Sequence, residues 1–478
     1  MLNHNNKRLV GYDMQGKVYD AQDHILREID KTYWSEAQDL LKQYKKNHLE
    51  KIGIVRTEQA DQQGFLSHEK HIISYPSEWA VSAFKEAARF HVQLFLDLDT
   101  YGLTLKDALP ENIVFNGFKP VFIDFLSIIK KENRVKEAWY KEIDPQNKGF
   151  NYIIFEKMFL PYILFPLIIM SRKDYKGARE LLWHNACNRG NHSTTWHDMI
   201  RMQGACSKIQ TAFQTARLYY ALTCAERKSF QDCCRDVLAS IEALEVASRS
   251  GSYVAYYEEK KENFSFDDQT NWKEKQKGVY QVLQQYKPKS VLDLGANTGW
   301  FSILAAKLGA KVTATDIDES CVDFLYRFAK QENLNILPLF LSFKDLQRSA
   351  FGAVPTDSVY QTDEFKKTPL FLPAHDRLQS DVVLCLGLLH HLVLGMNEKL
   401  EHVLSILAML THKALVLEFV ALDDSMIVTD PNFFKHLSKY SLKTYNIDRV
   451  LEEGKKFFRN AVLLPSHPET RQLIIFEK

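Results

Sequence analysis

The stretch from Ser290 to Asp318 constrains the fold of this chain more than any other part of it. It reads SVLDLGANTGWFSILAAKLGAKVTATDID. This order of residues predicts a buried strand, a glycine turn, an amphipathic helix, and a second strand that ends at an acid. In a doubly wound α/β domain these elements build a nucleoside pocket, because ligands bind beyond the carboxyl ends of parallel strands.

The glycine turn discriminates among nucleosides. A dinucleotide fingerprint needs glycines at three positions, the third for close packing of the helix. Counting from Gly295, the second and third positions are Asn297 and Trp300. An indole at the third position would disturb that packing, so NAD and FAD are disfavoured. A phosphate-binding P-loop is excluded because no Gly-Lys-Ser/Thr follows the turn.

S-adenosylmethionine fits the turn better because it carries no phosphate and needs only an open bend and hydrogen-bond partners. Gly295 and Gly299 supply the opening, and Asp293 can face the methionine ammonium directly or through water. Asp316 ends the second strand, 17 residues after Gly299. A carboxylate there can accept hydrogen bonds from both ribose hydroxyls. The alternative is an α/β domain whose turn binds nothing.

On these residues the segment resembles the class I S-adenosylmethionine-dependent methyltransferases, and more narrowly the NoeA-like subgroup. DLGANTG, an LxHHL segment and an EFV strand carry the narrower resemblance. The resemblance implies an α/β fold with a carboxy-terminal seven-stranded Rossmann-like domain. Its third, fourth and fifth strands would lie in 335–343, 381–392 and 414–420. FFRNAVLL and RQLIIFEK near the carboxyl terminus would form the antiparallel pair.

The resemblance also implies a set of cofactor-binding residues. After the third strand the family often has an Asp that accepts from the adenine amino group, whereas this chain has Ser342, with Asp345 three residues on. A hydroxyl is a weaker acceptor than a carboxylate, so this contact departs from the family. The full set of expected cofactor residues is Asp293, Gly295, Asn297, Gly299, Asp316, Ile317, Ser342 and Leu386.

Catalysis of methyl transfer demands little of the protein, because the sulfonium methyl is already activated. A base is needed only for a hydroxyl or a protonated amine. His390 and His391 follow the fourth strand, and we expect only one of them to point inward, with His391 favoured as the base. Glu418 in the fifth strand is the other candidate, to orient a histidine or bind an acceptor amine. Both features also have a purely structural interpretation.

A second pattern lies upstream, where Asp107, Asn112 and Asp124 resemble the catalytic segment of protein and small-molecule kinases. In that family the first Asp takes the substrate proton, and the Asn and second Asp hold Mg²⁺. No glycine-rich loop or strand lysine stands out before Asp107, and only about 75 residues precede the helix expected over 78–102. A degenerate substrate-positioning domain is favoured over an active phosphotransferase and over coincidence.

Length and composition place these patterns in a larger chain. The 478 residues suggest two or three domains. With the two resemblances, these would be an α+β kinase-like region over 1–130, a mostly helical region over 131–250 and the methyltransferase domain over 251–478. The net charge of +1 gives no global attraction to nucleic acid. The apolar run 158–170 is short and holds two prolines, so we expect a buried helix and no membrane span.

The cysteines and the amino terminus bear on the compartment. Seven cysteines without a disulfide-type spacing favour a reducing environment. The first residues lack the apolar core of a secretory signal, so we expect a cytoplasmic protein.

Two clusters remain ambiguous. His184, Cys187, His192 and His197 have residue types that suit zinc, but their spacing fits no standard site, so no metal is expected. Three tyrosines of the segment leading into the last domain either wall the cofactor site or pack on a linker: Tyr253, Tyr256 and Tyr257.

Two functions follow from these patterns. The favoured one is an S-adenosylmethionine-dependent methyltransferase whose upstream region recruits a small hydroxylated or glycan-type acceptor. The alternative is a phosphotransferase or interaction module that uses Asp107, Asn112 and Asp124, with the last domain only binding cofactor. The sequence does not indicate the oligomeric state.

Overall fold

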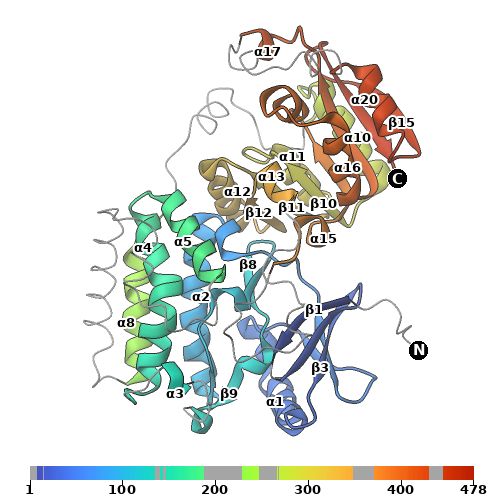
Figure 1. The fold of residues 1–478 in the computed structure, drawn as a ribbon. Coiled ribbons are helices and arrows are strands. Elements are labelled where there is room, and N and C mark those ends of the chain that lie inside the picture. Colours follow the sequence, from blue (N-terminus) through green and yellow to red (C-terminus); the bar gives the residue numbers. More distant parts are fainter. Residues whose placement is uncertain are drawn as a thin grey trace. The chain divides into compact units, whose positions relative to one another are not determined.

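The computed structural model describes residues 8–13, 15–134, 140–143, 147–187, 229–246, 266, 268–347, 371–429 and 445–478. Two compact units divide the chain (Figure 1). The amino-terminal unit contains Met1–Ala247 and Ala350–Leu372, and the carboxy-terminal unit contains Ser248–Ser349 and Pro373–Lys478. The segments 1–130 and 131–250, which the sequence suggested as separate regions, therefore share one unit.

A seven-stranded sheet forms the centre of the carboxy-terminal unit. Five neighbouring strands are parallel, and the last two run antiparallel to their neighbours. Strands occur at each range expected from the sequence, because long apolar runs suit parallel strands that are covered on both faces. The order across the sheet is β12 (Ile336–Phe340), β11 (Lys311–Asp316), β10 (Ser290–Leu294), β13 (Ser380–Cys385), β14 (Thr411–Val420), β16 (Arg471–Glu477) and β15 (Asn460–Pro465).

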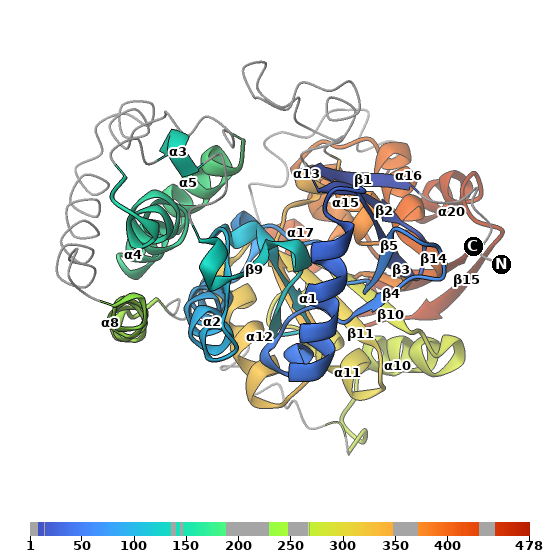
Figure 2. The same ribbon diagram turned by 90° about the horizontal axis from the view of Figure 1, so that it is seen from below.

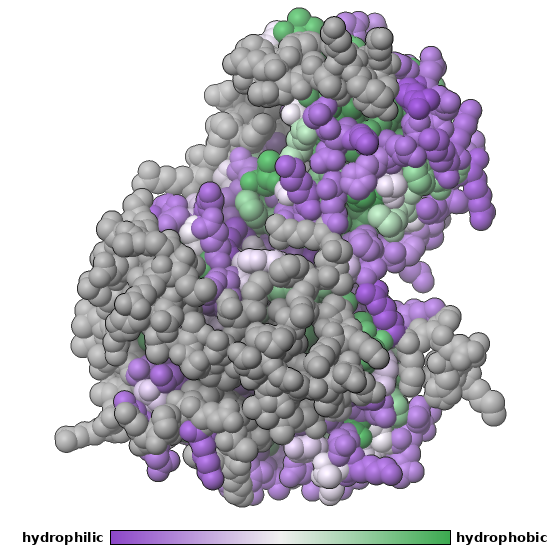
Figure 3. All heavy atoms as spheres, in the orientation of Figure 1, coloured by the Kyte–Doolittle hydropathy of each residue, from purple (hydrophilic) through white to green (hydrophobic). Residues whose placement is uncertain are grey.

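Amphipathic helices cover this sheet and bury their apolar sides against it. The core includes Val291, Val312 and Val416 from the strands and Ile303 from the helix after the glycine turn. On the face seen in Figure 3 the coloured atoms of this unit are mainly hydrophilic, with hydrophobic atoms in small separate patches. The helices are α10 (Glu274–Tyr286), α11 (Trp300–Lys307), α12 (Glu319–Gln331), α13 (Phe343–Leu346), α15 (Ala374–Arg377), α16 (Leu400–Leu410), α17 (Ser425–Thr429) and α20 (Ile447–Gly454).

Trp300, which takes the place of a third glycine, is accommodated at the start of α11. Its side chain is buried, and its ring lies 5.3 Å from that of Trp272 and 4.9 Å from that of Phe266 between centroids. The indole therefore packs into an aromatic cluster, and the close helix–strand approach of a dinucleotide fold is not needed.

The amino-terminal unit begins with a five-stranded antiparallel sheet and one helix that lies against it (Figure 2). The helix, α1 (Trp34–Asn47), follows the third strand and buries Ala37, Leu40, Leu41 and Tyr44. The described residues before position 78 thus form a small lobe of five strands and α1. Its strands, in sheet order, are β1 (Arg8–Asp13), β2 (Gly16–Asp20), β3 (His24–Ile29), β5 (Phe65–Glu69) and β4 (Thr57–Gln59).

The rest of this unit is built around α2 (Val81–Thr100). Two small antiparallel sheets of two strands each follow α2, formed by β6 (Leu103–Leu105) with β9 (Ile128–Lys130) and by the hairpin of β7 (Ile113–Asn116) and β8 (Lys119–Phe122). Helices α4 (Phe165–Ser171) and α8 (Phe230–Ala243) run beside α2 (Figures 1 and 2). The remaining helical elements are η2 (Leu49–Ile52), η3 (Pro76–Glu78), η4 (Pro110–Asn112), η5 (Phe125–Ser127), η6 (Lys131–Asn133), α3 (Tyr140–Ile143), η7 (Tyr152–Leu164) and α5 (Tyr175–Cys187).

The apolar run predicted as a buried helix lies in η7 and α4. Together they form the stretch Tyr152–Ser171, which is long and apolar enough to cross a membrane, yet 83% of its most apolar window is buried inside the protein. Such burial is what a core helix of a globular unit shows. Among the described residues, this is the one helix that meets the length and composition test.

His91 of α2 lies in an aromatic part of the amino-terminal core. Its ring stacks on Phe95 at 5.7 Å and meets the edges of Phe122 and Phe159 at 6.1 and 6.5 Å. The side chain is fully buried, and within the described residues neither ring nitrogen has a hydrogen-bond partner. Burial lowers the pKa of His91 from 6.5 to about 3, so the ring is neutral.

Phe371 belongs to the segment Ala350–Leu372 of the amino-terminal unit, although the parts of the chain before and after this segment belong to the carboxy-terminal unit. Its ring lies 4.8 Å from that of Tyr75 and stacks on Trp183 at 4.6 Å. The backbone N–H of Leu372 donates to the Tyr75 hydroxyl at 2.7 Å. The carboxy-terminal unit resumes at Pro373, so the chain visits the amino-terminal unit between β12 and β13.

Candidate active site

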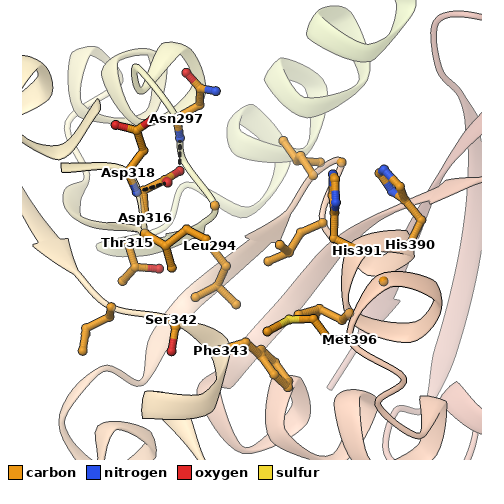
Figure 4. Close-up of a pocket in the computed structure, with 18 of the residues that line it drawn as sticks. Leu294, Asn297, Thr315, Asp316, Asp318, Ser342, Phe343, His390, His391 and Met396 are labelled. Carbon is orange, nitrogen blue, oxygen red and sulfur yellow. Dashed lines mark hydrogen bonds between the residues drawn. The ribbon is translucent and has the colours of Figure 1, made fainter. Parts of the chain in front are cut away.

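A pocket of about 780 Å³ opens at the carboxyl ends of β10, β11, β12 and β13 (Figure 4). Pockets for small ligands have volumes of about 300–1,000 Å³. Six of the eight expected cofactor residues line it: Gly295, Asn297, Asp316, Ile317, Ser342 and Leu386.

Some residues of the glycine turn line the pocket, and another lets two helices pack closely. Gly295 and Asn297 line the pocket, with φ of 67° and 54°. Gly299 precedes α11 and is not among the lining residues. With φ of 84°, a Cβ on Gly299 would lie 2.5 Å from a methyl carbon of Leu325. Gly299 therefore allows α11 to approach α12, and its expected role in cofactor binding stays a prediction.

Asp316 ends β11 and is held by the backbone of the turn. Its Oδ2 accepts a hydrogen bond from the Asn297 N–H at 2.7 Å, and its Oδ1 accepts one from the Asp318 N–H at 2.9 Å (Figure 4). Burial raises the pKa of this carboxyl, and the backbone donors partly oppose the rise. Each oxygen keeps acceptor capacity, because a carboxylate has about four lone-pair sites. The carboxylate is thus fixed with its free sites available to a ligand.

Asp293 lies in the strand but does not line the pocket. Its side chain is buried and accepts a hydrogen bond from the Ser302 hydroxyl at 2.7 Å. Burial raises its pKa to about 6. Asp293 therefore anchors α11 to β10, and its contact with the methionine ammonium stays a prediction.

Ser342 and Ile317 also line the pocket. The Ser342 hydroxyl donates to Asp345 Oδ2 at 2.6 Å and accepts from the Asp345 N–H at 3.3 Å, as the cap of α13. Its polar capacity is largely used within the protein, which extends the departure from the family. Ile317 is 66% exposed, and an exposed apolar side chain at a pocket marks a surface that a ligand can cover.

His390 and His391 both line the pocket, with ring centroids 4.2 Å apart (Figure 4). The expectation that only one would point inward assumed a strand, in which neighbours diverge by 180°. Here the backbone of His390 is helical, with φ of −65° and ψ of −35°, so neighbouring side chains diverge less. His390 is buried and His391 exposed. Burial, together with His391, lowers the pKa of His390 to about 3.

Glu418 lies in the fifth strand, as expected, and its contacts are with Lys275 and Ser466. It is fully buried in β14 and is not among the lining residues. Its carboxylate accepts from the Lys275 ammonium at 2.7 Å and from the Ser466 hydroxyl at 2.8 Å. Lys275, from α10, does line the pocket. Glu418 therefore positions Lys275 and has no direct contact with the histidines.

Several residues that line the pocket were not predicted from the sequence, among them Lys275, Met396, Met426 and Arg471. Arg471 donates two hydrogen bonds to Asp424, of 2.8 and 3.0 Å. Met396 and Met426 are about half exposed. A basic residue on the helix before the first strand was the one available signal for Lys275. Arg471 begins β16 and Met426 lies in α17, and no motif in the sequence marks either of them as a pocket residue.

The upstream triple is brought together in the amino-terminal unit. The Asn112 amide donates to Asp107 Oδ1 at 2.7 Å, and Ser127 donates to Asp107 Oδ2 at 3.3 Å. Burial and the nearby Asp124 raise the pKa of Asp107 to about 6. Arg27 of β3, which the sequence reading did not single out, donates to Asp124 Oδ1 at 3.2 Å.

Other sequence candidates fall partly or wholly outside the described residues. His192, His197 and the three tyrosines Tyr253, Tyr256 and Tyr257 lie there, as does 188–228 of the region expected to be mostly helical. Within the described part of the chain, no group of three or more His, Cys, Asp or Glu side chains could hold a metal ion.

Comparison with known proteins adds two sequence similarities. Residues 257–350 match the family of tellurite resistance protein TehB, a range that contains β10, the glycine turn, β11 and β12. The chain is also 26% identical to nodulation protein NoeA of Rhizobium meliloti (strain 1021), over 87% of this chain and 85% of that protein. The similarity to NoeA thus extends through both units.

Two solved structures are similar to parts of the chain. The bifunctional kinase-methyltransferase WbdD matches 46% of this chain and 41% of its own, at 17% identity and a TM-score of 0.29. Magnesium protoporphyrin IX methyltransferase (ChlM) from Synechocystis PCC 6803, solved with bound SAH, matches 42% of this chain and 81% of its own, at 16% identity and a TM-score of 0.26. The match to WbdD spans less than half of that protein.

Proposed function

We propose that the carboxy-terminal unit is an S-adenosylmethionine-dependent methyltransferase that acts on a small hydroxylated or glycan-type acceptor. The observation that carries the proposal is the Asp316 carboxylate at the tip of β11, held by the Asn297 N–H at 2.7 Å beside the open glycine turn. A fixed carboxylate at this edge suits the two hydroxyls of a ribose. Similarity to NoeA and to the TehB family supports the same assignment.

The two ends of the pocket suit the two ends of the cofactor. Next to Asp316, the exposed Ile317 offers an apolar surface for adenine. Toward β13 and α10, the Lys275 ammonium offers a positive charge for the methionine carboxylate. The turn carries no third glycine and no P-loop lysine, so a pyrophosphate would find little support there.

The histidines lie at the carboxyl end of β13, where an acceptor can approach. S-adenosylmethionine supplies an activated methyl group, so the protein must orient the acceptor and exclude water. We assign His391 as the residue that takes the proton of an acceptor hydroxyl. As the acceptor oxygen bonds to the methyl carbon, the sulfur–methyl bond breaks and S-adenosylhomocysteine is left. His390 stays neutral and fills the wall behind His391.

The alternative function places phosphoryl transfer in the amino-terminal unit. The contacts of Asp107 with Asn112, and the nearby Asp124, are the observation that favours it.

Among the described residues, four cysteines are buried free thiols, which supports a reducing, cytoplasmic location for either function: Cys233, Cys234, Cys321 and Cys385.

Calorimetry on the full chain tests the proposed function. S-adenosylmethionine and S-adenosylhomocysteine should each bind at one site, and NAD should not bind. Absence of binding by both cofactors would remove the assignment. Binding of Mg-ATP without binding of either cofactor would favour the alternative.

A further inference from the structure

The amino-terminal unit holds a buried charged cluster that methyl transfer does not use. It consists of Arg27, Asp107, Asn112 and Asp124. Arg27 is 6% exposed and Asp107 9% exposed, and the two come from strand β3 and from the loop after β6. Burying charges is costly unless they are paired. The way these charges are paired therefore indicates what the cluster can bind.

The order of elements around the cluster matches the kinase resemblance seen in the sequence. A five-stranded antiparallel sheet with α1 between its third and fourth strands precedes the Asp107 loop. The β1–β2 hairpin carries Gly11 and Gly16 five residues apart with Val18 two further on, a spacing shared with the kinase glycine-rich loop, although the middle glycine is missing. By resemblance, Asn112 and Asp124 would hold Mg²⁺ and β3 would supply a lysine.

The residues present do not fit a magnesium site. Asp124 Oδ1 accepts from the Arg27 guanidinium at 3.2 Å, with the two side chains 21% and 7% exposed. The Asn112 amide N–H is directed at Asp107 Oδ1 at 2.7 Å. A guanidinium is charged at every relevant pH and has a rigid fork of donors, so it is not interchangeable with lysine. The positive charge that Mg²⁺ would bring beside Asp124 is already there.

Helix α1 explains why Arg27 pairs with Asp124. In a kinase the strand lysine pairs with a glutamate of this helix. Here the side chains that α1 buries are Ala37, Leu40, Leu41 and Tyr44, none of which is an acid. Tyr44 instead packs its ring edge-on to Phe125, 5.4 Å away, and its hydroxyl donates to the Val55 carbonyl at 3.2 Å. With no carboxylate on the inner face of α1, Asp124 provides the counter-charge of Arg27.

A further contact joins the β1–β2 hairpin to the Asp107 loop. The Lys106 ammonium donates to the Gln15 side chain at 2.8 Å, which ties the tip of the β1–β2 hairpin to the Asp107 loop. A glycine-rich loop that covers phosphates must instead leave room for them.

We propose that the Arg27 guanidinium takes the place of a divalent cation in the amino-terminal unit. The unit then holds its Asp107–Asn112–Asp124 cluster together without metal and does not transfer phosphate. Its charged cluster serves to fix the small lobe to the rest of the unit, through the Arg27–Asp124 pair.

Binding of Mn²⁺ to the full chain tests this inference, with free Mn²⁺ measured by electron paramagnetic resonance. The wild-type protein should show no stoichiometric site at millimolar Mn²⁺. Arg27→Gln should gain one site, and Arg27→Gln combined with Asp124→Asn should lose it again. A matched control is Arg89→Gln, which removes an arginine of α2 paired with Glu86 and should gain no site.

Two results would overturn the proposal. One is a stoichiometric Mn²⁺ site in the wild-type chain that Asp124→Asn removes. The other is a folded Arg27→Gln variant, judged by its thermal transition, that gains no site. If Arg27→Gln does not fold, the titration of the wild-type chain and of Asp124→Asn decides. Cofactor binding by the other unit is measured separately and does not depend on these outcomes.

Discussion

The Lys275 ammonium lies 2.7 Å from a carboxylate oxygen of Glu418, a side chain with no exposed surface. The lysine keeps 20% of its side-chain surface exposed and reaches the pocket. The pair is therefore asymmetric. Loss of the lysine strands a buried negative charge, whereas loss of the acid leaves a cation that can still reach solvent or ligand.

This asymmetry predicts different effects on stability. Lys275→Met should lower the stability of the carboxy-terminal unit by about 3 kcal/mol, because breaking a buried pair leaves one charge uncompensated. Glu418→Gln should cost less, since its amide can still bond to Ser466 and Lys275. Thermal denaturation of both variants checks the order. Equal losses, or a larger loss for Glu418→Gln, would contradict it.

Lys275 should also discriminate between ligands. If its ammonium binds the methionine carboxylate, Lys275→Met should weaken S-adenosylmethionine by roughly 10-fold, which corresponds to about 1.4 kcal/mol. Adenosine, which lacks that carboxylate, should bind the variant and the wild type alike. Calorimetry with both ligands makes the comparison, and a similar loss for adenosine would mean that the variant distorts the pocket.

Asp316 should dominate cofactor affinity. Asp316→Asn removes the charge that strengthens its hydrogen bonds, and a loss of about 2 kcal/mol is expected, or roughly 30-fold. Asp381→Asn is a matched control, because that acid lies in β13 near the opposite end of the sheet and bonds to Lys413 at 2.9 Å. It should leave the affinity unchanged. Titration of both variants with S-adenosylhomocysteine gives the result, and unchanged affinity in Asp316→Asn would exclude ribose binding by this residue.

Two glycines of similar backbone but different surroundings form a pair of tests. Gly299 and Gly309 have φ of 84° and 94°. A Cβ at Gly299 would meet Leu325 at 2.5 Å, whereas at Gly309 it would meet nothing within 4 Å. Gly309→Ala should cost about 1 kcal/mol for the strained backbone, and Gly299→Ala should cost clearly more because Leu325 is buried. Melting temperatures of the two variants check this. Equal shifts would show that the Leu325 side chain can move aside at no cost in stability.

His91 should make the amino-terminal unit sensitive to acid. Its pKa in the folded protein, about 3, lies below the ordinary value of 6.5. The unfolded chain therefore binds more protons between these values, and stability falls as the pH drops below 6.5. His91→Phe should stabilise the protein, and more so at pH 5 than at pH 8. Urea denaturation at the two pH values measures this.

The exposed His402 of α16 provides the control for that experiment. His402→Phe should change the pH dependence little. A loss of stability in His91→Phe at both pH values would indicate that the imidazole is needed for packing in a way that the surrounding phenylalanines do not reveal.

The strands and the glycine turn could be predicted because they follow from local patterns. Apolar runs, positive-φ glycines and a strand-terminal acid are each set by a few neighbouring residues. Asp316 was therefore found by reading along the chain. The direction of a side chain within a strand is harder: Asp293 and Asp316 both end up near the turn, yet Asp293 faces Ser302 and not the pocket.

The pairings of buried charges could not be predicted, because they join distant parts of the sequence. Lys275 and Glu418 are separated by 143 positions, and Arg27 and Asp124 by 97. Each partner alone looks like an ordinary charged residue. Only the packing of α10 on the sheet, or of the small lobe on the Asp107 loop, shows that the charges meet.

The packing of Phe371 against Tyr75 and Trp183 determines where the protein can be cut into fragments that fold. The chain returns to the first unit between β12 and β13. A fragment that starts at residue 248 would therefore contain Phe371 but lack Tyr75 and Trp183, the two rings that Phe371 packs against. Such a fragment would expose an apolar ring to water. The two halves are therefore interleaved along the chain, and a single cut does not yield two self-sufficient proteins.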